Sequence, residues 1–326
     1  MFVNDQYEAI DFGENRRLER FGEIILDRPC PAATHFNKKS QSLWSCVDAV
    51  FQIDEKSSKK SNTLGQRGLW FGQTELGRSI FPRMTADQLS GNAAINSLAW
   101  QIRHDQAVFN LQGTPFGHIG IFPEQAANWD AIKTFCLRHS SQETAFRVLN
   151  LFAYTGGSTL AAIQGGAEVV HVDSASNVVG WARKNAESSQ FPQTVVRWIV
   201  EDARKFVHRE LKRGNKYQGV ILDPPSYGHG TRGEVWRLTD QLPGLLFDCF
   251  SLLKFRFPCF LLLTCHTPGF SLNRLVNLVE DTAKDAFQNG FDRQSMRVHA
   301  NTMTLRAKSG AILPSGESVM FCYNDY

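Results

Sequence analysis

The sequence lacks a long apolar run of the kind that crosses a membrane. The most apolar stretch of the 326 residues is 245–265, and four residues interrupt it: Asp248, Lys254, Arg256 and Pro258. A membrane-spanning helix needs about 20 predominantly apolar residues. Residues 1–22 are polar and charged, unlike a secretory signal peptide. These features predict a cytoplasmic protein without a membrane partner.

Cysteines in C-x-x-C spacing are also missing. The seven cysteines are an odd number: Cys30, Cys46, Cys136, Cys249, Cys259, Cys265 and Cys322. A disulfide framework needs paired cysteines, and many zinc sites use the C-x-x-C motif. We therefore expect neither a disulfide framework nor a bound metal, and we expect a reducing compartment.

Charge of one sign is not in large excess, since the formal net charge is +3. Hydrophobic residues make up 42% and charged residues 21% of the chain, which is typical of globular proteins. The charge permits an anionic partner without demanding one, because nucleic-acid binding depends on clustered charge. The length predicts about two domains of ~150 residues each.

The two parts of the chain differ in pattern. Residues 1–110 contain short strand-like runs, namely EIILDR, DAVFQI, GLWFGQ and QAVFNLQ, separated by polar or glycine-containing stretches. Such runs predict a small β-rich (α+β) N-terminal module, which is a candidate for RNA binding. Residues 111–326 are predicted to form a second, larger domain.

From residue 146 onward, apolar strands alternate with helices. The expected strands are FRVLNLFA, EVVHVD, VVRWIVED, YQGVILD and CFLLLTCH, and helices should begin near Ser158, Ser176, Ala203 and Thr239. This alternation predicts a doubly wound, Rossmann-like α/β fold with a parallel sheet covered on both faces. Residues flanking SGAILPSG predict a C-terminal antiparallel hairpin at the sheet edge. In such sheets the ligand binds beyond the carboxyl ends of the strands.

The turn at residues 154–157 follows the first of these strands. It lacks the G-x-G-x-x-G pattern of dinucleotide sites, and no lysine follows its glycines as in a P-loop. Gly156 and Gly157 allow a ligand to approach the backbone closely. The turn therefore fits a nucleoside ligand without phosphates.

Three carboxylates stand at the ends of successive predicted strands: Asp173, Asp202 and Asp223. Asp173 could accept hydrogen bonds from a ribose diol, the role of an acid about 20 residues after the glycines of nucleotide folds. Asp202 could accept from an adenine amino group. Any one of these acids could instead cap a helix or form a turn, but the ordered set favours a nucleoside ligand.

The segments VLNLFAYTGG, HVDSA, EDA and DPPSY, in this order and spacing, resemble motifs I to IV of class I S-adenosylmethionine-dependent methyltransferases. More narrowly, LNLFAYTGGSTLAA and LDPPSYG are similar to the bacterial large-subunit ribosomal RNA cytosine-C5 methyltransferases. The upstream TPFGHIGIFPEQAANW resembles the lead-in of that family. The resemblance covers about residues 112–270.

The resemblance implies S-adenosylmethionine as the cofactor, and RNA, most naturally ribosomal RNA, as the substrate. It implies a cofactor site of Phe122, Gln125, Asn150, Phe152, Ala153, Tyr154, Thr155, Gly156, Asp173, Ser174, Asp202, Ala203 and Asp223. In this site Tyr154 and Gly156 would line the methionine and ribose, and Asp202 with Ala203 would meet the adenine edge. Asp223 would lie near the sulfonium. Asn150 stands where many relatives have an acid.

The catalytic candidates are Asp223, Pro224, Tyr227 and Cys265. Cytosine-C5 chemistry needs a thiolate nucleophile, yet Thr267 stands at the position of the family's cysteine. Cys265 lies two residues earlier and is alternatively a buried structural residue. His266 is predicted to point away from Cys265 if the strand continues. Tyr227 could stack on a base or simply cover the cofactor.

Arg232 and Arg237 follow the DPPSY segment and are candidates for holding RNA phosphates. The basic stretch 203–216 is more simply a solvated amphipathic helix. Two other functions stay open: a methyltransferase for a small molecule or protein, and a cofactor-binding RNA-associated protein without catalysis. The glycine spacing argues against an NAD oxidoreductase.

Overall fold

The computed structural model describes residues 2–3, 5–54, 67–82, 100–141, 145–229, 235–288 and 291–325. The chain splits into two compact units. Unit 1 comprises residues 1–126 and 304–315, and unit 2 comprises residues 127–303 and 316–326. None of the helices within the described ranges is long and apolar enough to span a membrane.

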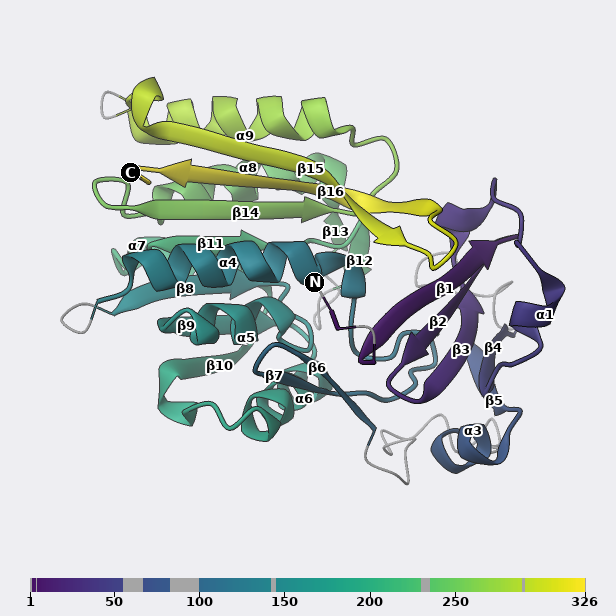
Figure 1. Cartoon of the computed structure of the whole chain (residues 1–326). Coiled ribbons are helices and arrows are strands. Elements are labelled where there is room, and N and C mark those ends of the chain that lie inside the picture. The colour runs from purple at the N-terminus through teal and green to yellow at the C-terminus, as the bar shows by residue number, and fades with distance from the viewer. Residues whose placement is uncertain are drawn as a thin grey trace. The chain divides into compact units, whose positions relative to one another are not determined.

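Unit 2 is built on most of a seven-stranded sheet with the order β10-β9-β8-β11-β14-β16-β15 (Figure 1). The strands are β8 (Phe146–Leu151), β9 (Ala167–Asp173), β10 (Val196–Val200), β11 (Gly219–Leu222), β14 (Cys259–Cys265), β15 (Met296–Arg306) and β16 (Ile312–Tyr323). The first five in this order are parallel, and β16 runs antiparallel to β14. The predicted fold class, including the C-terminal hairpin, is confirmed.

The strand order reverses between β8 and β11. Strands β9 and β10 lie on one side of β8, whereas β11 and β14 lie on its other side. Parallel sheets covered on both faces have continuous apolar strands. Strand β14 accordingly has all of its side chains buried. The crevice at such a reversal is the usual ligand site of an open α/β sheet.

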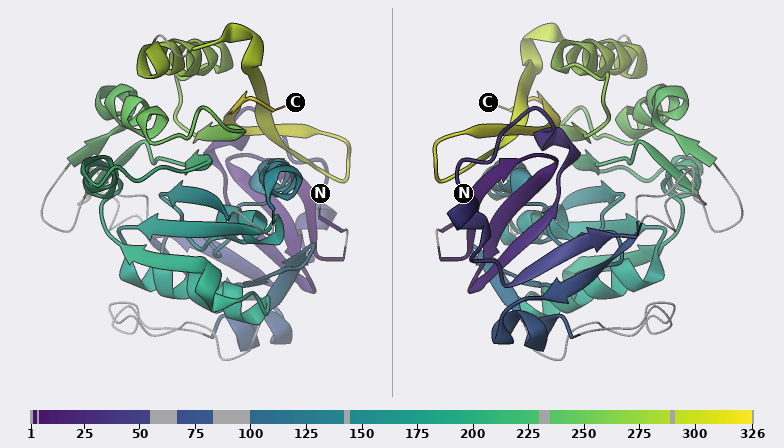
Figure 2. Two further views of the ribbon diagram at one scale, coloured as in Figure 1. Left: turned by 90° about the vertical axis from the view of Figure 1, so that its left-hand side faces the viewer. Right: turned by 90° about the vertical axis from the view of Figure 1, so that its right-hand side faces the viewer.

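The long helices are α4 (Ala126–His139), α5 (Gly157–Gln164), α6 (Ser176–Ser188), α7 (Ala203–Lys212), α8 (Leu238–Ser251) and α9 (Leu272–Phe287). Helices α7, α8 and α9 pack on one face of the sheet, in a core that includes Leu149, Leu222 and Leu263 (Figure 2). On the other face, the Phe135 ring of α4 packs at an angle against Phe146 and Phe260, with ring centroids 6.0 Å and 5.0 Å away. A short hairpin, β12 (Tyr227–His229) and β13 (Val235–Arg237), follows β11.

Unit 1 contains a five-stranded sheet with the order β1-β2-β3-β4-β5. Its strands are β1 (Tyr7–Gly13), β2 (Arg16–Phe21), β3 (Ile24–Pro29), β4 (Ala49–Ile53) and β5 (Gly68–Gly72), and β6 (Gln101–His104) pairs with β7 (Ala107–Asn110). Its helices are α1 (Gln41–Trp44) and α3 (Glu75–Ile80), and short 3-10 turns occur in the chain at 31–33, 123–125, 193–195 and 293–295.

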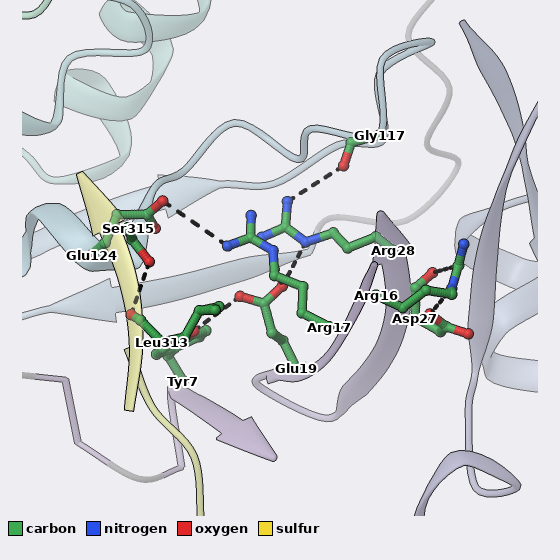
Figure 3. A network of polar contacts seen from close by, with 10 residues as sticks. All are labelled: Tyr7, Arg16, Arg17, Glu19, Asp27, Arg28, Gly117, Glu124, Leu313 and Ser315. Atoms are coloured by element: carbon green, nitrogen blue, oxygen red, sulfur yellow. Dashed lines mark hydrogen bonds and ion pairs between the residues drawn. The ribbon is translucent and has the colours of Figure 1, made fainter. Parts of the chain in front are cut away.

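A buried ion-pair network lies in unit 1 (Figure 3). Glu19 accepts hydrogen bonds from the Tyr7 hydroxyl at 2.9 Å and from Nε of Arg28 at 2.6 Å. Nε of Arg17 lies 3.1 Å from the same carboxylate. Burial alone would raise the pKa of Glu19, but the two guanidinium groups hold it below its ordinary value. The network fixes β1, β2 and β3 to one another, because each strand supplies at least one member.

Candidate active site

The loop that follows β8 has an unusual backbone. Phe152, Tyr154 and Gly156 all have positive φ, at 55°, 48° and 92°. Positive φ is uncommon outside glycine, and such residues cluster at functional sites. The Ala153 amide donates to the Val172 carbonyl at 3.1 Å, which ties the loop to β9.

Close packing requires the two glycines of this loop. A Cβ on Gly157 would lie 2.6 Å from the Trp129 ring, and one on Gly156 would lie 3.2 Å from Cβ of Ala182. The first residue of α5 therefore sits directly against α4. The Asn185 side chain donates to the Thr155 carbonyl at 3.0 Å and holds the loop from α6.

Asp173 ends β9 and faces this loop. One carboxylate oxygen accepts from the Tyr154 amide at 3.0 Å, and the other accepts from the Ala175 amide at 3.0 Å. Burial raises the pKa of Asp173, and these amides partly oppose the rise. The two backbone bonds fix the plane of the carboxylate and leave each oxygen able to accept a further hydrogen bond. Ser174, which follows, is exposed.

A buried polar chain lies beneath the loop. Nδ2 of Asn150 donates to Oγ1 of Thr159 at 2.9 Å, and that hydroxyl is 2.9 Å from Nδ1 of His171. Burial lowers the pKa of His171 to about 3, so its ring is neutral at pH 7. Asn150 is thus engaged with α5. The sequence reasoning missed Thr159 and His171, because a lone polar residue in an apolar strand or helix carries no recognisable pattern.

Asp202 follows β10 and caps α7, because its Oδ1 accepts from the Lys205 amide at 3.0 Å. Ala203 begins the helix and is buried. The capping role and the predicted contact with an adenine edge are compatible, since the second carboxylate oxygen retains its lone pairs.

Asp223 follows β11, next to the loop in the sheet. Leu222 pairs with Leu151 of β8 and with Leu263 of β14 in register. Oδ1 of Asp223 accepts from the Thr264 hydroxyl at 2.5 Å and lies 3.5 Å from Nε2 of His266. The sheet therefore brings Asp223 together with two side chains of the β14 end.

Further hydrogen bonds hold the Asp223–Tyr227 segment. Pro224 is buried, and the Pro225 carbonyl accepts from Nε1 of Trp236 at 2.6 Å. Oγ of Ser226 lies 2.7 Å from Oγ1 of Thr267. The segment is thus tied both to β13 and to the residues after β14.

Tyr227 and Arg237 are partners in the β12–β13 hairpin. Tyr227 is half-buried, which a residue that stacks on a base requires. Arg237 is exposed, which a ligand of RNA phosphates requires. Arg232 lies outside the described residues. The roles predicted for all three remain predictions.

Cys265 is the last residue of β14 and is only 2% exposed. Burial raises the pKa of its thiol, and hydrogen bonds from Thr267 counter this only in part. Because the thiolate is the reactive form, this environment disfavours a nucleophile. Strand β14 ends at Cys265, and the exposed His266 that follows contacts Asp223 instead.

Phe122 and Gln125 belong to unit 1. The Phe122 ring makes an edge contact with His118, with centroids 5.3 Å apart, and Gln125 is buried. Their predicted part in the cofactor site remains a prediction. Across the described part of the chain, no three His, Cys, Asp or Glu side chains are grouped so as to hold a metal ion.

Comparison with known proteins identifies the family to which this chain is similar. A family model described as S-adenosylmethionine-dependent methyltransferase matches residues 124–289. The ribosomal RNA large subunit methyltransferase I of Aeromonas salmonicida is 35% identical over 113 residues, which are 34% of this chain and 27% of that protein. The enzyme of the same name from Tolumonas auensis is 34% identical over 142 residues, 43% of this chain and 35% of that protein. The matches therefore span only about a third of these relatives.

The crystal structure of an S-adenosylmethionine-dependent methyltransferase from Agrobacterium tumefaciens is similar over nearly the whole chain. Its TM-score is 0.77 at 28% sequence identity, with 98% of this chain and 90% of that chain covered. The family match spans just over half of the sequence. The chain therefore belongs to the S-adenosylmethionine-dependent methyltransferases, and S-adenosylmethionine is its cofactor, as the sequence predicted.

Proposed function

We propose that this chain transfers a methyl group from S-adenosylmethionine to a base of ribosomal RNA. The observation that carries the proposal is the carboxyl edge of four adjacent strands. Asp202 follows β10, Asp173 ends β9, the loop 152–156 follows β8, and Asp223 follows β11. A nucleoside with a charged sulfonium fits this order of acids.

The residues present fit the cofactor. Asp173, oriented by two backbone amides, would accept from the ribose hydroxyls, and Asp202 would accept from the adenine amino group. The loop at Tyr154–Gly156 would lie along the methionine and ribose. Asn150 would act through Thr159, which already accepts from it. The bound cofactor supplies an electrophilic methyl group on a positively charged sulfur, and Asp223 would stabilise that charge.

Ribosomal RNA is proposed as the substrate because the relatives from Aeromonas salmonicida and Tolumonas auensis are named for it. The exposed Arg237, with Arg232, would hold phosphates beside the site, and Tyr227 would stack on the base. Such a substrate would place the reaction in the cytoplasm, among ribosomes. Unit 1, with its β-rich sheet, is the candidate for further RNA contacts.

We propose a nitrogen rather than cytosine C5 as the methyl acceptor. C5 attack needs a protein thiolate, and burial raises the pKa of the only cysteine at the expected strand end. Attack by nitrogen needs alignment with the methyl group and a hydrogen-bond acceptor, a role that Asp223 and the Pro224 carbonyl would fill.

The test is incubation with methyl-labelled S-adenosylmethionine and ribosomal RNA from a strain that lacks the gene. We expect label in RNA, sensitive to nuclease and resistant to protease. Asp223→Ala should abolish transfer, while Cys265→Ala should retain most of it. Asp240→Ala is the matched control, because Asp240 is an exposed residue of α8.

Two outcomes would contradict the proposal. Label confined to protein or to small molecules would exclude RNA as the acceptor. A Cys265→Ala variant that binds cofactor but transfers nothing, with a covalent adduct between the parent protein and 5-fluorocytosine RNA, would establish C5 chemistry.

A further inference from the structure

His266 and Asp223 form a pair at the carboxyl edge of the sheet. Nε2 of His266 lies 3.5 Å from Oδ1 of Asp223. The two side chains are 36% and 35% exposed, so both can be reached from outside. Asp223 follows β11, the neighbour of β8, and His266 follows β14, on the other side of β11.

The fold holds both members of the pair in place. The Thr264 hydroxyl donates to Oδ1 of Asp223 at 2.5 Å, which fixes the carboxylate. On the other side of the imidazole, a Cβ on Gly316 would lie 2.7 Å from Nδ1 of His266 and 3.0 Å from the Cys265 carbonyl. Gly316 also has φ +125°, where side chains are disfavoured. A glycine here leaves the space that the ring occupies.

We propose that His266 is the proton acceptor of the methyl transfer and that Asp223, 3.5 Å away, stabilises its protonated form. The inference rests on the proposed function and narrows it, since it requires an acceptor nitrogen that carries a hydrogen. The new N–CH₃ bond would form as the S–CH₃ bond breaks, and the electron pair of that bond would stay on sulfur. The proton would pass from the acceptor nitrogen to the imidazole of His266, and the Asp223 carboxylate would stabilise the imidazolium.

The neighbouring groups are poorer proton acceptors. The Cys265 thiol is almost completely buried. Glu317, the register partner of Cys265 on β16, accepts a hydrogen bond from the Thr302 hydroxyl at 2.7 Å. Asp223 is in contact with His266, whereas Cys265 precedes it on β14 and Glu317 pairs with Cys265 in register. The Asp223 carboxylate at this distance favours an imidazolium.

The first test compares His266→Gln with the parent in single-turnover transfer to ribosomal RNA. General-base catalysis contributes about 10²–10⁴-fold, so the rate should fall at least about 100-fold. The dissociation constant for S-adenosylmethionine should change less than about twofold. The parent rate should rise with pH across part of the range of about pH 5–8, where histidine titrates, and this rise should vanish in the variant.

His208→Gln is the matched control, because His208 is exposed on α7 and outside the site. It should keep the parent rate and pH profile. A His266→Gln variant that keeps both would overturn the inference. A parent protein that methylates no RNA would instead contradict the proposed function.

A second measurement decides the inference without any RNA. The imidazole NMR signal of His266 is followed against pH in complexes with S-adenosylmethionine and with S-adenosylhomocysteine. The positive sulfonium disfavours a nearby imidazolium, so the titration midpoint should be lower with S-adenosylmethionine, by roughly one pH unit for a charge within about 6 Å. Equal midpoints would show that His266 is not beside the reacting sulfur, and would overturn the inference.

Discussion

Each carboxylate oxygen of Asp173 accepts a hydrogen bond from one backbone amide. This geometry predicts how much Asp173 contributes to cofactor binding. Asp173→Ala should weaken the binding of both S-adenosylmethionine and S-adenosylhomocysteine by roughly 1–3 kcal/mol, because polar partners lose their acceptor. Both ligands should be affected equally, since the ribose is common to them. Isothermal calorimetry measures the two affinities.

Asp281→Ala is the control for this prediction, because the Asp281 side chain is 72% exposed on α9. It should leave both affinities unchanged. If the parent bound NAD and not S-adenosylmethionine, the interpretation of Asp173 would be wrong.

We expect the buried His171 to make the stability of the folded chain depend on pH. Its folded pKa of about 3 lies below the ordinary value, so the unfolded chain binds a proton that the folded chain does not. The stability that the neutral ring contributes is complete above about pH 6.5 and is lost progressively as the pH falls toward 3. At pH 5 the loss should be about 2 kcal/mol. Urea unfolding at pH 7 and pH 5 measures it.

His171→Asn should be less stable at pH 7 but should lose less free energy of unfolding between pH 7 and pH 5 than the parent. His208→Asn, at an exposed position, should keep the parent slope. Identical slopes for the parent and His171→Asn would disprove a neutral buried ring.

At the scale of elements, the start of α5 is the most constrained point of the site. Gly157→Ala forces a Cβ to within 2.6 Å of the Trp129 ring. Overpacking of this kind costs about 1–3 kcal/mol, and the shift of α5 should also weaken cofactor binding. Thermal unfolding and calorimetry measure the two effects.

Gly180→Ala is the matched substitution, since nothing lies within 4 Å of the added Cβ on the exposed side of α6. It should stabilise the chain by roughly 0.5–1 kcal/mol, because alanine loses less entropy than glycine in a helix. Equal effects of the two substitutions would mean that the packing at Gly157 is unimportant.

The sequence predicted the elements of unit 2 better than those of unit 1. Helices expected near Ser176 and Ala203 begin at those residues, because long apolar strands and helix signals agree there. The hairpin β1–β2 was missed, since its residues look polar and charged. Its turn is formed by Glu14 and Asn15, both at positive φ. A buried ion-pair network stabilises these strands in addition to buried apolar side chains such as Leu18 and Phe21.

The sequence predicted those site residues that lie at the end of a single strand. Asp173, Asp202 and Asp223 could be found in this way, since a strand end is visible in the sequence. His266 could not, because its meeting with Asp223 depends on β14 ending at Cys265 and on the register of two strands distant in sequence. The buried chain of Asn150, Thr159 and His171 joins three elements and leaves no local pattern.

At the scale of the whole molecule, the proposed RNA substrate predicts salt dependence. Affinity for ribosomal RNA fragments should fall steeply with salt, because each phosphate contact releases counterions. Replacing both Arg232 and Arg237 by alanine should reduce the slope of log affinity against log salt by roughly 2. Filter binding at several salt concentrations measures the slope.

The matched control replaces Arg183, which is exposed on α6, and Arg256, which is exposed between α8 and β14, and should leave the slope nearly unchanged. An unchanged slope in the Arg232/Arg237 variant would move the RNA contact elsewhere, most naturally to unit 1. The predicted domain boundary near residue 110 also remains a prediction. Limited proteolysis with mass spectrometry would locate it.

Unit 1 is discontinuous in sequence, and this has a consequence for how the protein is made. Residues 304–315 belong to it, and the Lys308 amide donates to the Ala9 carbonyl at 2.8 Å. A ribosome adds roughly 5–20 residues per second, so the intervening residues 127–303 take roughly 10–35 s to translate. The first sheet must wait that long for its last segment. We therefore expect nascent chains stopped before residue 304 to leave β1 without this partner, open to chaperones and proteases.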